Sequence, residues 1–455
     1  MLPPAFAERM KTLLLDDYPA FLREMTEMPA RHALRVNTIK IPVSDFLTQS
    51  NIPTSPIPYT QDGFYHDEEK VGGLPFHHAG AIYSQDPGAM ATVNALPIGR
   101  GWRVLDVCAA PGGKSAQLAA AIGEEGLLVS NEFVPSRCKL LVGNIERLGI
   151  KNALALNTDS KTLGEWYPDY FDLVLVDAPC SGEGMFRKSE EALSDWSEET
   201  VRRCAERQTE ILENAYQTVA PGGYLLYSTC TFSIEENEAQ IAAFLEKHPD
   251  FYLCPVNEEL CKHTAPGIPY KGLDLSFTRR FYPHISPGEG QYLALLQRKN
   301  EGERRELPAY RDTSEAPHKA MLPALRSFFT SAWGDGEAAN RVRSLRGNLI
   351  LPPRVPLPPH SVFAAGVMAG EIRKDICFPH HQLFSAYGHC FTRQLTLLPD
   401  DKRLTEYLRG EVIPAAEIES GYCVVTLAGC PLGGAKVSGG MAKNLYPKGL
   451  RLRGA

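Results

Sequence analysis

Short apolar runs alternate with amphipathic stretches between residues 100 and 300. The apolar runs cover residues 102–107, 126–132, 153–159, 171–180, 222–230 and 291–296. Stretches in which apolar side chains recur every three or four residues lie between them, at 115–122, 135–148, 198–219 and 235–248. Strands that alternate with helices in this way are typical of a parallel sheet. The pattern therefore predicts an α/β domain.

The segments on either side follow other patterns. Residues 5–27 place apolar side chains at helical spacing, residues 33–38 alternate like a strand, and prolines punctuate the chain up to about residue 75. These features predict a small α+β module. Residues 301–320 are charged and polar, as expected of a linker. Beyond about residue 375, short strand-like pieces among many glycines predict a β-rich module.

The changes of pattern set the expected domains. They are an N-terminal α+β module at 1–90, the α/β domain at 91–300, a linker and following segment at 301–375, and the β-rich module at 376–455.

Composition narrows the class of protein only a little. The chain is 44% hydrophobic and 22% charged, as ordinary globular proteins are. No apolar stretch approaches the length of a membrane span, and the first residues lack the features of a signal peptide. We therefore expect a cytoplasmic protein without a membrane partner. The 11 cysteines form no Cys-x-x-Cys pair and no zinc-like spacing, which predicts free thiols and no metal.

Charge is unevenly distributed along the chain. The net charge of −7 argues mildly against a nucleic-acid partner. From Ser420 to Ala455, however, there is no acidic residue, and five basic ones fall there: Lys436, Lys443, Lys448, Arg451 and Arg453. This tail could neutralise several phosphates, or it could be a solvated terminus without a partner.

The turn after the first strand, at residues 106–114, has the make-up of a ligand-binding turn. Its glycines let a ligand approach the backbone, and the following helix N-terminus favours negative charge. Glu132, after the second strand, is placed to accept hydrogen bonds from ribose hydroxyls, and Asp159, after the third, from an adenine amino group. Together they predict an adenosine-containing cofactor. The alternative is a turn that only bends sharply, with two surface carboxylates.

Two cysteines, Cys180 and Cys230, stand at the ends of the fourth and fifth predicted strands. The carboxyl ends of parallel strands line the crevice in which ligands bind. A thiolate there can add to an electron-poor carbon and later be expelled. The alternatives are that both cysteines are small buried hydrophobes and that the nearby Asp177 caps a helix.

Several segments resemble a known family. Residues 106–114, 177–182 and 228–231 closely resemble the signature segments of the Nop/Sun family of RNA cytosine-5 methyltransferases, and residues 34–38 and 83–86 resemble segments that precede them. Residues 443–451 resemble the end of the bacterial subgroup that modifies small-subunit ribosomal RNA and carries a C-terminal PUA-like RNA-binding module. One departure is Gly290-Gln291-Tyr292, where the family usually has paired phenylalanines.

The resemblance implies a fold, a cofactor and a substrate. The implied fold is a Rossmann-like class I methyltransferase with a seven-stranded, mostly parallel sheet, flanked by the two modules. The implied activity is transfer of a methyl group from S-adenosyl-L-methionine to carbon-5 of cytosine in 16S ribosomal RNA. The implied cofactor-binding residues are Cys108, Ala109, Ala110, Pro111, Gly112, Gly113, Lys114, Glu132, Arg137, Asp159 and Asp177. An exposed helix arginine remains an alternative for Arg137.

The resemblance also assigns the chemistry. Cys230 attacks carbon-6 of the cytosine, Cys180 serves the later release of the enzyme, and Asp177 and Lys114 contact the edge of the base. The base must be single-stranded or flipped out to be reached. The expected RNA contacts are Arg35, Asn37, Lys443, Lys448 and Arg451.

Three other functions remain open at this point. They are the same chemistry on transfer RNA, a catalytically silent ribosome-assembly factor that only binds RNA, and a small-molecule methyltransferase, although the last leaves the two flanking modules unexplained. DNA is disfavoured, because DNA enzymes take their nucleophile from a Pro-Cys segment while the Thr-Cys segment is complete here. The expected partner is ribosomal RNA or the small ribosomal subunit, and a monomer is expected.

Overall fold

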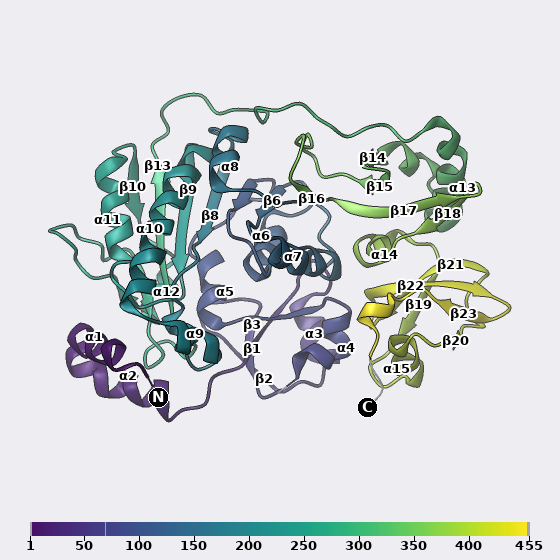
Figure 1. Cartoon of the computed structure of the whole chain (residues 1–455). Coiled ribbons are helices and arrows are strands. Elements are labelled where there is room, and N and C mark those ends of the chain that lie inside the picture. Colours follow the sequence, from purple (N-terminus) through teal and green to yellow (C-terminus); the bar gives the residue numbers. More distant parts are fainter. Residues whose placement is uncertain (1, 69, 453–455) are drawn as a thin grey trace.

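The computed structural model describes residues 2–68 and 70–452, and a large mixed sheet organises its centre (Figure 1). Seven strands form the expected sheet. In spatial order they are β7 (Ala153–Leu156), β6 (Leu127–Asn131), β5 (Arg103–Asp106), β8 (Phe171–Asp177), β9 (Val219–Thr229), β13 (Gln291–Arg298) and β10 (Phe251–Cys254). The first five are parallel, and β13 runs antiparallel between β9 and β10. The predicted class I methyltransferase fold is confirmed.

Three further strands extend this sheet to ten. They are β11 (Ala265–Pro266), β12 (Arg279–Phe281) and β16 (Val362–Ala365). The sequence patterns missed all three and also β10, because none of these strands is longer than four residues.

Helices cover both faces of the sheet. Successive side chains of a strand point to opposite faces, so Val104 packs in one hydrophobic cluster and Leu105 in the other. Three helices contribute to the Val104 face: α5 (Pro87–Val93), α6 (Gly113–Ile122) and α7 (Pro135–Arg147). Three contribute to the Leu105 face: α8 (Ser160–Trp166), α10 (Glu198–Ala215) and α11 (Glu238–Lys247). Two short helices, α9 (Glu190–Asp195) and α12 (Glu258–Lys262), lie in the connections.

The N-terminal module has the expected α+β make-up. Its antiparallel sheet has the order β2 (Thr54–Pro56), β3 (Gly63–His66), β1 (Ala33–Val36), β4 (Ile82–Ser84), with helices α3 (Val43–Gln49) and α4 (Pro75–His78). The first two helices, α1 (Pro4–Leu14) and α2 (Tyr18–Thr26), pack instead on the methyltransferase domain, where Phe6 and Phe21 join one hydrophobic cluster with Phe232.

The segment expected as a linker is partly structured. Residues 301–318 are irregular, but helix α13 (Leu322–Trp333) follows, and β16 returns to pair with β7. A separate sheet contains β14 (Arg343–Leu345), β15 (Asn348–Leu351), β17 (Val367–Arg373) and β18 (Ile376–Pro379). This sheet crosses the boundary expected between residues 375 and 376.

The C-terminal module is rich in strands, as predicted. Its sheet has the order β19 (Gln394–Leu397), β21 (Gly421–Leu427), β22 (Cys430–Ser438), β23 (Met441–Asn444), β20 (Ile413–Pro414), and helices α14 (His381–Tyr387) and α15 (Lys402–Arg409) pack nearby. This module shares one hydrophobic cluster with the N-terminal module, in which Val36 and Val425 both take part. At the junction, the Lys40 amine donates hydrogen bonds to the carbonyls of Ser385 (2.7 Å) and Pro431 (2.8 Å).

Candidate active site

A cavity of about 680 Å³ opens at the carboxyl edge of the main sheet. Among the residues that line it are Cys108, Ala110, Glu132, Arg137, Asp159, Asp177, Cys180 and Cys230. Each ends one of the five parallel strands, follows one, or lies in a helix that follows one. The topology therefore gathers at one edge side chains that lie far apart in the sequence.

The two glycines of the first turn serve tight packing. Gly112 has a φ of 112°, which disfavours any residue with a side chain, and a Cβ there would lie 3.1 Å from a Leu141 methyl group. A Cβ on Gly113 would lie 2.8 Å from the Tyr83 ring. The turn therefore fits between α7 and the N-terminal module, and Gly112 faces α7.

Contacts with nearby residues fix the positions of two carboxylates that line the cavity, Glu132 and Asp159. Glu132 is buried and accepts a hydrogen bond from the Val134 N–H (2.9 Å). Arg137 lies 3.7 Å from the Glu132 carboxylate and donates to the Ala110 carbonyl (2.9 Å), so it joins Glu132 to the turn. Asp159 is exposed and caps α8 by accepting from the Thr162 N–H, which lowers its pKa.

Asp177, which lines this cavity, forms an ion pair with Lys114, which lines a second, smaller cavity. The Lys114 amine lies 2.9 Å from the Asp177 carboxylate, which also accepts a hydrogen bond from the Ser228 hydroxyl (2.6 Å). Burial lowers the pKa of Lys114, but Asp177, together with Cys230 and Asp106, outweighs burial, so the pKa is raised and the amine stays protonated. The second cavity, about 210 Å³, is lined by Tyr83, Gln85, Lys114 and Asp177 among others.

The two predicted catalytic cysteines meet in the larger cavity. Their sulfur atoms lie 3.2 Å apart, and both thiols are free. The hydrogen bond to Cys230, followed by burial, raises the pKa of Cys180 well above its ordinary value. Cys180 therefore stays a protonated thiol that can donate to Cys230. Burial likewise raises the pKa of Cys108, which lines both cavities.

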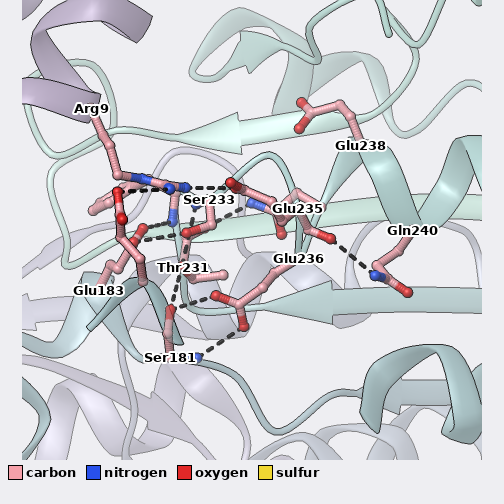
Figure 2. Close-up of polar contacts among 12 residues, drawn as sticks. Arg9, Ser181, Glu183, Thr231, Ser233, Glu235, Glu236, Glu238 and Gln240 are labelled. Atoms are coloured by element: carbon pink, nitrogen blue, oxygen red, sulfur yellow. Dashed lines mark hydrogen bonds and ion pairs between the residues drawn. The ribbon is translucent and has the colours of Figure 1, made fainter. Parts of the chain in front are cut away.

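Buried carboxylates support the two cysteine segments, and sequence reasoning missed them. Figure 2 shows Glu183 and Glu236 pointing toward the residues that follow Cys230 and Cys180, respectively. The available signal was a glutamate a few residues after each cysteine, but spacing along the chain does not show which segment a carboxylate will contact.

Two of the five predicted RNA contacts are wrong, because Arg35 and Asn37 are fully buried in β1 and the turn that follows it. The Arg35 guanidinium donates to the Gln85 side chain (3.1 Å) and the Gly113 carbonyl (3.3 Å). Asn37 donates to the carbonyls of Gly80 (2.8 Å) and Leu148 (2.9 Å). Both side chains fasten the N-terminal module to the methyltransferase domain.

The predicted contacts in the C-terminal module differ in exposure. Lys443 and Lys448 are exposed, and Lys443 lies opposite the exposed Lys436 on the neighbouring strand. Arg451 is half-buried and donates to the Tyr446 carbonyl (3.2 Å). Arg453 lies outside the described residues. Lys443, Lys448 and Arg451 stay predictions.

The sheet order and the crevice at its carboxyl edge define a Rossmann-like methyltransferase. In the part of the chain that the structure describes, no helix is long and apolar enough to cross a membrane. No cluster of three or more His, Cys, Asp or Glu side chains within those same residues could hold a metal ion.

Comparisons with known proteins identify the family. Residues 94–297 match the family described as 16S rRNA methyltransferase RsmB/F, residues 2–87 the N-terminal domain of 16S rRNA methyltransferase RsmF, and residues 394–452 the methyltransferase RsmF PUA domain. The chain is 32% identical over 469 residues to ribosomal RNA small subunit methyltransferase F of Aeromonas salmonicida, covering 96% of this chain and 94% of that protein. The chain therefore belongs to the ribosomal RNA small subunit methyltransferase F family.

Other relatives match over a shorter span. The protein of the same name from Vibrio vulnificus is 43% identical over 315 residues, which are 65% of this chain and 64% of that protein. Among solved structures, a methyltransferase homologue from Pyrococcus horikoshii is 27% identical with a TM-score of 0.55, covering 65% of this chain and 94% of that one. NSun6 from Pyrococcus horikoshii with SFG, 21% identical with a TM-score of 0.56 over 66% of this chain and 99% of that one, shares the fold.

Proposed function

We propose that this protein transfers a methyl group from S-adenosylmethionine to carbon-5 of a cytosine in small-subunit ribosomal RNA. The observation that carries the proposal is the pair of thiols 3.2 Å apart, in one cavity with Glu132 and beside the Lys114–Asp177 pair. The family descriptions support the substrate class, since they name 16S ribosomal RNA. Such a substrate also fits the expected cytoplasmic location.

The larger cavity fits an adenosine-containing methyl donor. Its volume of about 680 Å³ suits a molecule of that size, and Glu132 offers a buried carboxylate for ribose hydroxyls. Cys108, Ala109, Ala110 and Pro111 supply the backbone of the turn, and Asp159, which also lines the larger cavity, offers a carboxylate for an adenine amino group. When bound, S-adenosylmethionine supplies an electrophilic methyl group.

The protein side chains activate the base. The Cys230 thiolate adds to carbon-6, which makes carbon-5 nucleophilic enough to accept a methyl group. Asp177 hydrogen-bonds the base edge and stabilises the protonated ring nitrogen, while the Lys114 cation polarises the same edge. Removal of the carbon-5 proton then allows the Cys230–carbon bond to break. Cys180, whose sulfur lies 3.2 Å from that of Cys230, serves this release directly as its thiolate or through a water, either of which takes the carbon-5 proton.

A direct test measures methyl transfer from labelled S-adenosylmethionine to total RNA and to isolated small subunits. Wild type is compared with Cys230→Ala, Cys180→Ala and, as control, Cys261→Ala, whose cysteine is exposed and lines neither cavity. We expect 5-methylcytosine in small-subunit RNA, lost in Cys230→Ala and retained in Cys261→Ala. Cys180→Ala should accumulate a covalent protein–RNA adduct. Transfer that survives Cys230→Ala, or no labelled RNA although cofactor binds, would contradict the proposal.

A further inference from the structure

Two buried glutamates join the segments that carry Cys180 and Cys230 (Figure 2). Glu183 follows Cys180 by three residues and is 1% exposed. Its carboxylate accepts hydrogen bonds from the Phe232 N–H (2.8 Å), the Ser233 hydroxyl (2.8 Å) and the Trp196 indole (3.0 Å). A glutamate on the Cys180 segment therefore holds the residues that follow Cys230.

Glu236 makes the reverse connection. It follows Cys230 by six residues and is fully buried. It accepts hydrogen bonds from the Ser181 N–H (2.9 Å), the Ser181 hydroxyl (2.5 Å) and the Gln208 amide (2.9 Å). Gln208 also donates to the Pro179 carbonyl (3.0 Å), so Cys180 is anchored on both sides.

Direct bonds between the two segments complete the connection. The Gly184 N–H donates to the Cys230 carbonyl (2.9 Å), and the hydroxyls of Ser181 and Thr231 lie 2.9 Å apart. The groups that the two carboxylates accept from are peptide N–H groups, hydroxyls, an amide and an indole, none of which carries a charge. Burying a carboxylate among neutral donors is costly, and burial raises the pKa of Glu236 to about 7. An apolar packing residue would avoid that cost, which argues for a role in placing the two segments.

We propose that Glu183 and Glu236 are positioning residues, each of which controls the cysteine on the opposite segment. Glu183 places Cys230 for attack on the base, and Glu236 places Cys180 for release of the adduct. The assignment of steps rests on the proposed function, whereas the control of thiol spacing does not. A reacting group displaced by about 1 Å can cost on the order of 100-fold in rate, so modest loosening of either segment should be measurable.

The geometry distinguishes two substitutions. Both Glu183 oxygens accept from fixed N–H donors, Phe232 and Trp196, so Glu183→Gln must turn its new NH₂ group toward one of them. In Glu236→Gln the NH₂ group can face the Ser181 hydroxyl, which can accept instead of donate. Glu183→Gln and Glu236→Met should therefore break the connection, and Glu236→Gln should preserve it. Glu235→Gln and Glu235→Met are matched controls, because Glu235 lies one residue away and pairs with Arg9.

The first experiment does not depend on RNA. Diamide oxidises the Cys180–Cys230 pair to a disulfide, accepting the two electrons and two protons that the thiols lose, and mass spectrometry follows that peptide pair. We expect disulfide formation about tenfold slower in Glu183→Gln and Glu236→Met, because loosened thiols lose effective concentration. Glu236→Gln and the Glu235 controls should react at the wild-type rate. Wild-type rates in Glu183→Gln and Glu236→Met, with unchanged circular dichroism, would overturn the proposal.

If Glu183→Gln and Glu236→Met fail to fold, milder variants test whether the two carboxylates control thiol spacing. Ser233→Ala removes one donor to Glu183, and Ser181→Ala removes one donor to Glu236. Both should slow disulfide formation in the same direction by a smaller factor. If neither slows it, the carboxylates do not control thiol spacing.

The second experiment uses small-subunit RNA and separates the two steps. Glu236→Met should accumulate the covalent adduct, as Cys180→Ala does, whereas Glu183→Gln should form the adduct slowly without accumulating it. Equal slowing of both steps in both variants would overturn the assignment of each glutamate to the opposite cysteine. If wild type transfers no methyl group, the proposed function fails, and the diamide experiment still decides the control of thiol spacing.

Discussion

Two regions of this molecule bury polar side chains, and they use them differently. Where the N-terminal module meets the methyltransferase domain, the Arg35 and Asn37 side chains donate hydrogen bonds to carbonyl oxygens and to a neighbouring side-chain amide. At the carboxyl edge of the main sheet, both cysteines line the larger cavity, Lys114 lines the smaller one, and Asp177 lines both. Both regions carry motifs of the family, so resemblance alone does not separate a fastening residue from a reacting one. The direction of the polar atoms, toward protein or toward a cavity, does separate them.

The strongest test of the comparison is Asp177→Asn. The change removes the negative charge that faces both cavities but keeps the size of the side chain and its contact with Ser228. Methyl transfer to RNA should fall about 100-fold or more, as expected when a group that assists proton movement is removed. The thermal midpoint should change little, because the amide oxygen can still accept a hydrogen bond from the Lys114 amine. A large loss of stability with intact transfer would place Asp177 among the fastening residues.

Arg35→Met should do the opposite of Asp177→Asn and lower stability rather than the function of the folded protein. Arg35 is fully buried and lies 3.6 Å from Asp62, so its loss should lower the free energy of unfolding by about 3 kcal/mol, as for a broken buried ion pair. Urea unfolding measures this change, and RNA affinity of the folded protein should remain at the wild-type value. Weaker RNA binding with unchanged stability would restore Arg35 as an RNA contact.

Charge reversal in the C-terminal module tests a third kind of polar residue, the exposed one. Lys443→Glu with Lys448→Glu should weaken RNA binding about tenfold at low salt. The slope of its salt dependence should fall by about one for each phosphate that the variant no longer neutralises. Lys11→Glu with Lys271→Glu, at two exposed positions outside the C-terminal module, changes the net charge by the same amount and is the control. Equally weakened binding in both proteins would show a general effect of charge rather than a binding surface.

The smallest expected effect is a change in the pH dependence of stability caused by Asp106. This residue lies in the active-site region, but its carboxylate accepts a hydrogen bond from the Ser115 hydroxyl (2.6 Å). Burial raises its pKa from 3.8 to about 7. Between these two pH values, Asp106 is protonated in the folded protein and ionised in the unfolded chain. This bound proton stabilises the folded state. The stabilisation is therefore complete below the lower value and is lost as pH rises through 7. Urea unfolding at pH 5 and pH 7.5 should show a smaller decrease in Asp106→Asn than in wild type. An identical decrease in both proteins would mean that Asp106 is ionised at both pH values.

Much of the fold follows from local pattern. The strands predicted at 102–107, 126–132, 153–159, 171–180, 222–230 and 291–296 all exist, because each apolar run is long enough to cross a buried sheet. Edge strands escaped prediction: β11 has 2 residues and β16 has 4, too few to show a period. β16 is a strand only because the chain returns to the free edge of β7.

For the candidate site, the sequence was enough to place particular residue types at the end of each strand, since an apolar run and the residues that follow it are recognised locally. Cys180, Cys230, Asp177 and Glu132 were placed at the carboxyl edge in this way, and all four line the cavity there. The burial of Arg35 and Asn37, and the connection of Glu183 and Glu236 to each other's segments, came only from the packed molecule. Burial and hydrogen-bond partners depend on what packs against a segment from elsewhere in the chain, and spacing along the sequence does not contain that information.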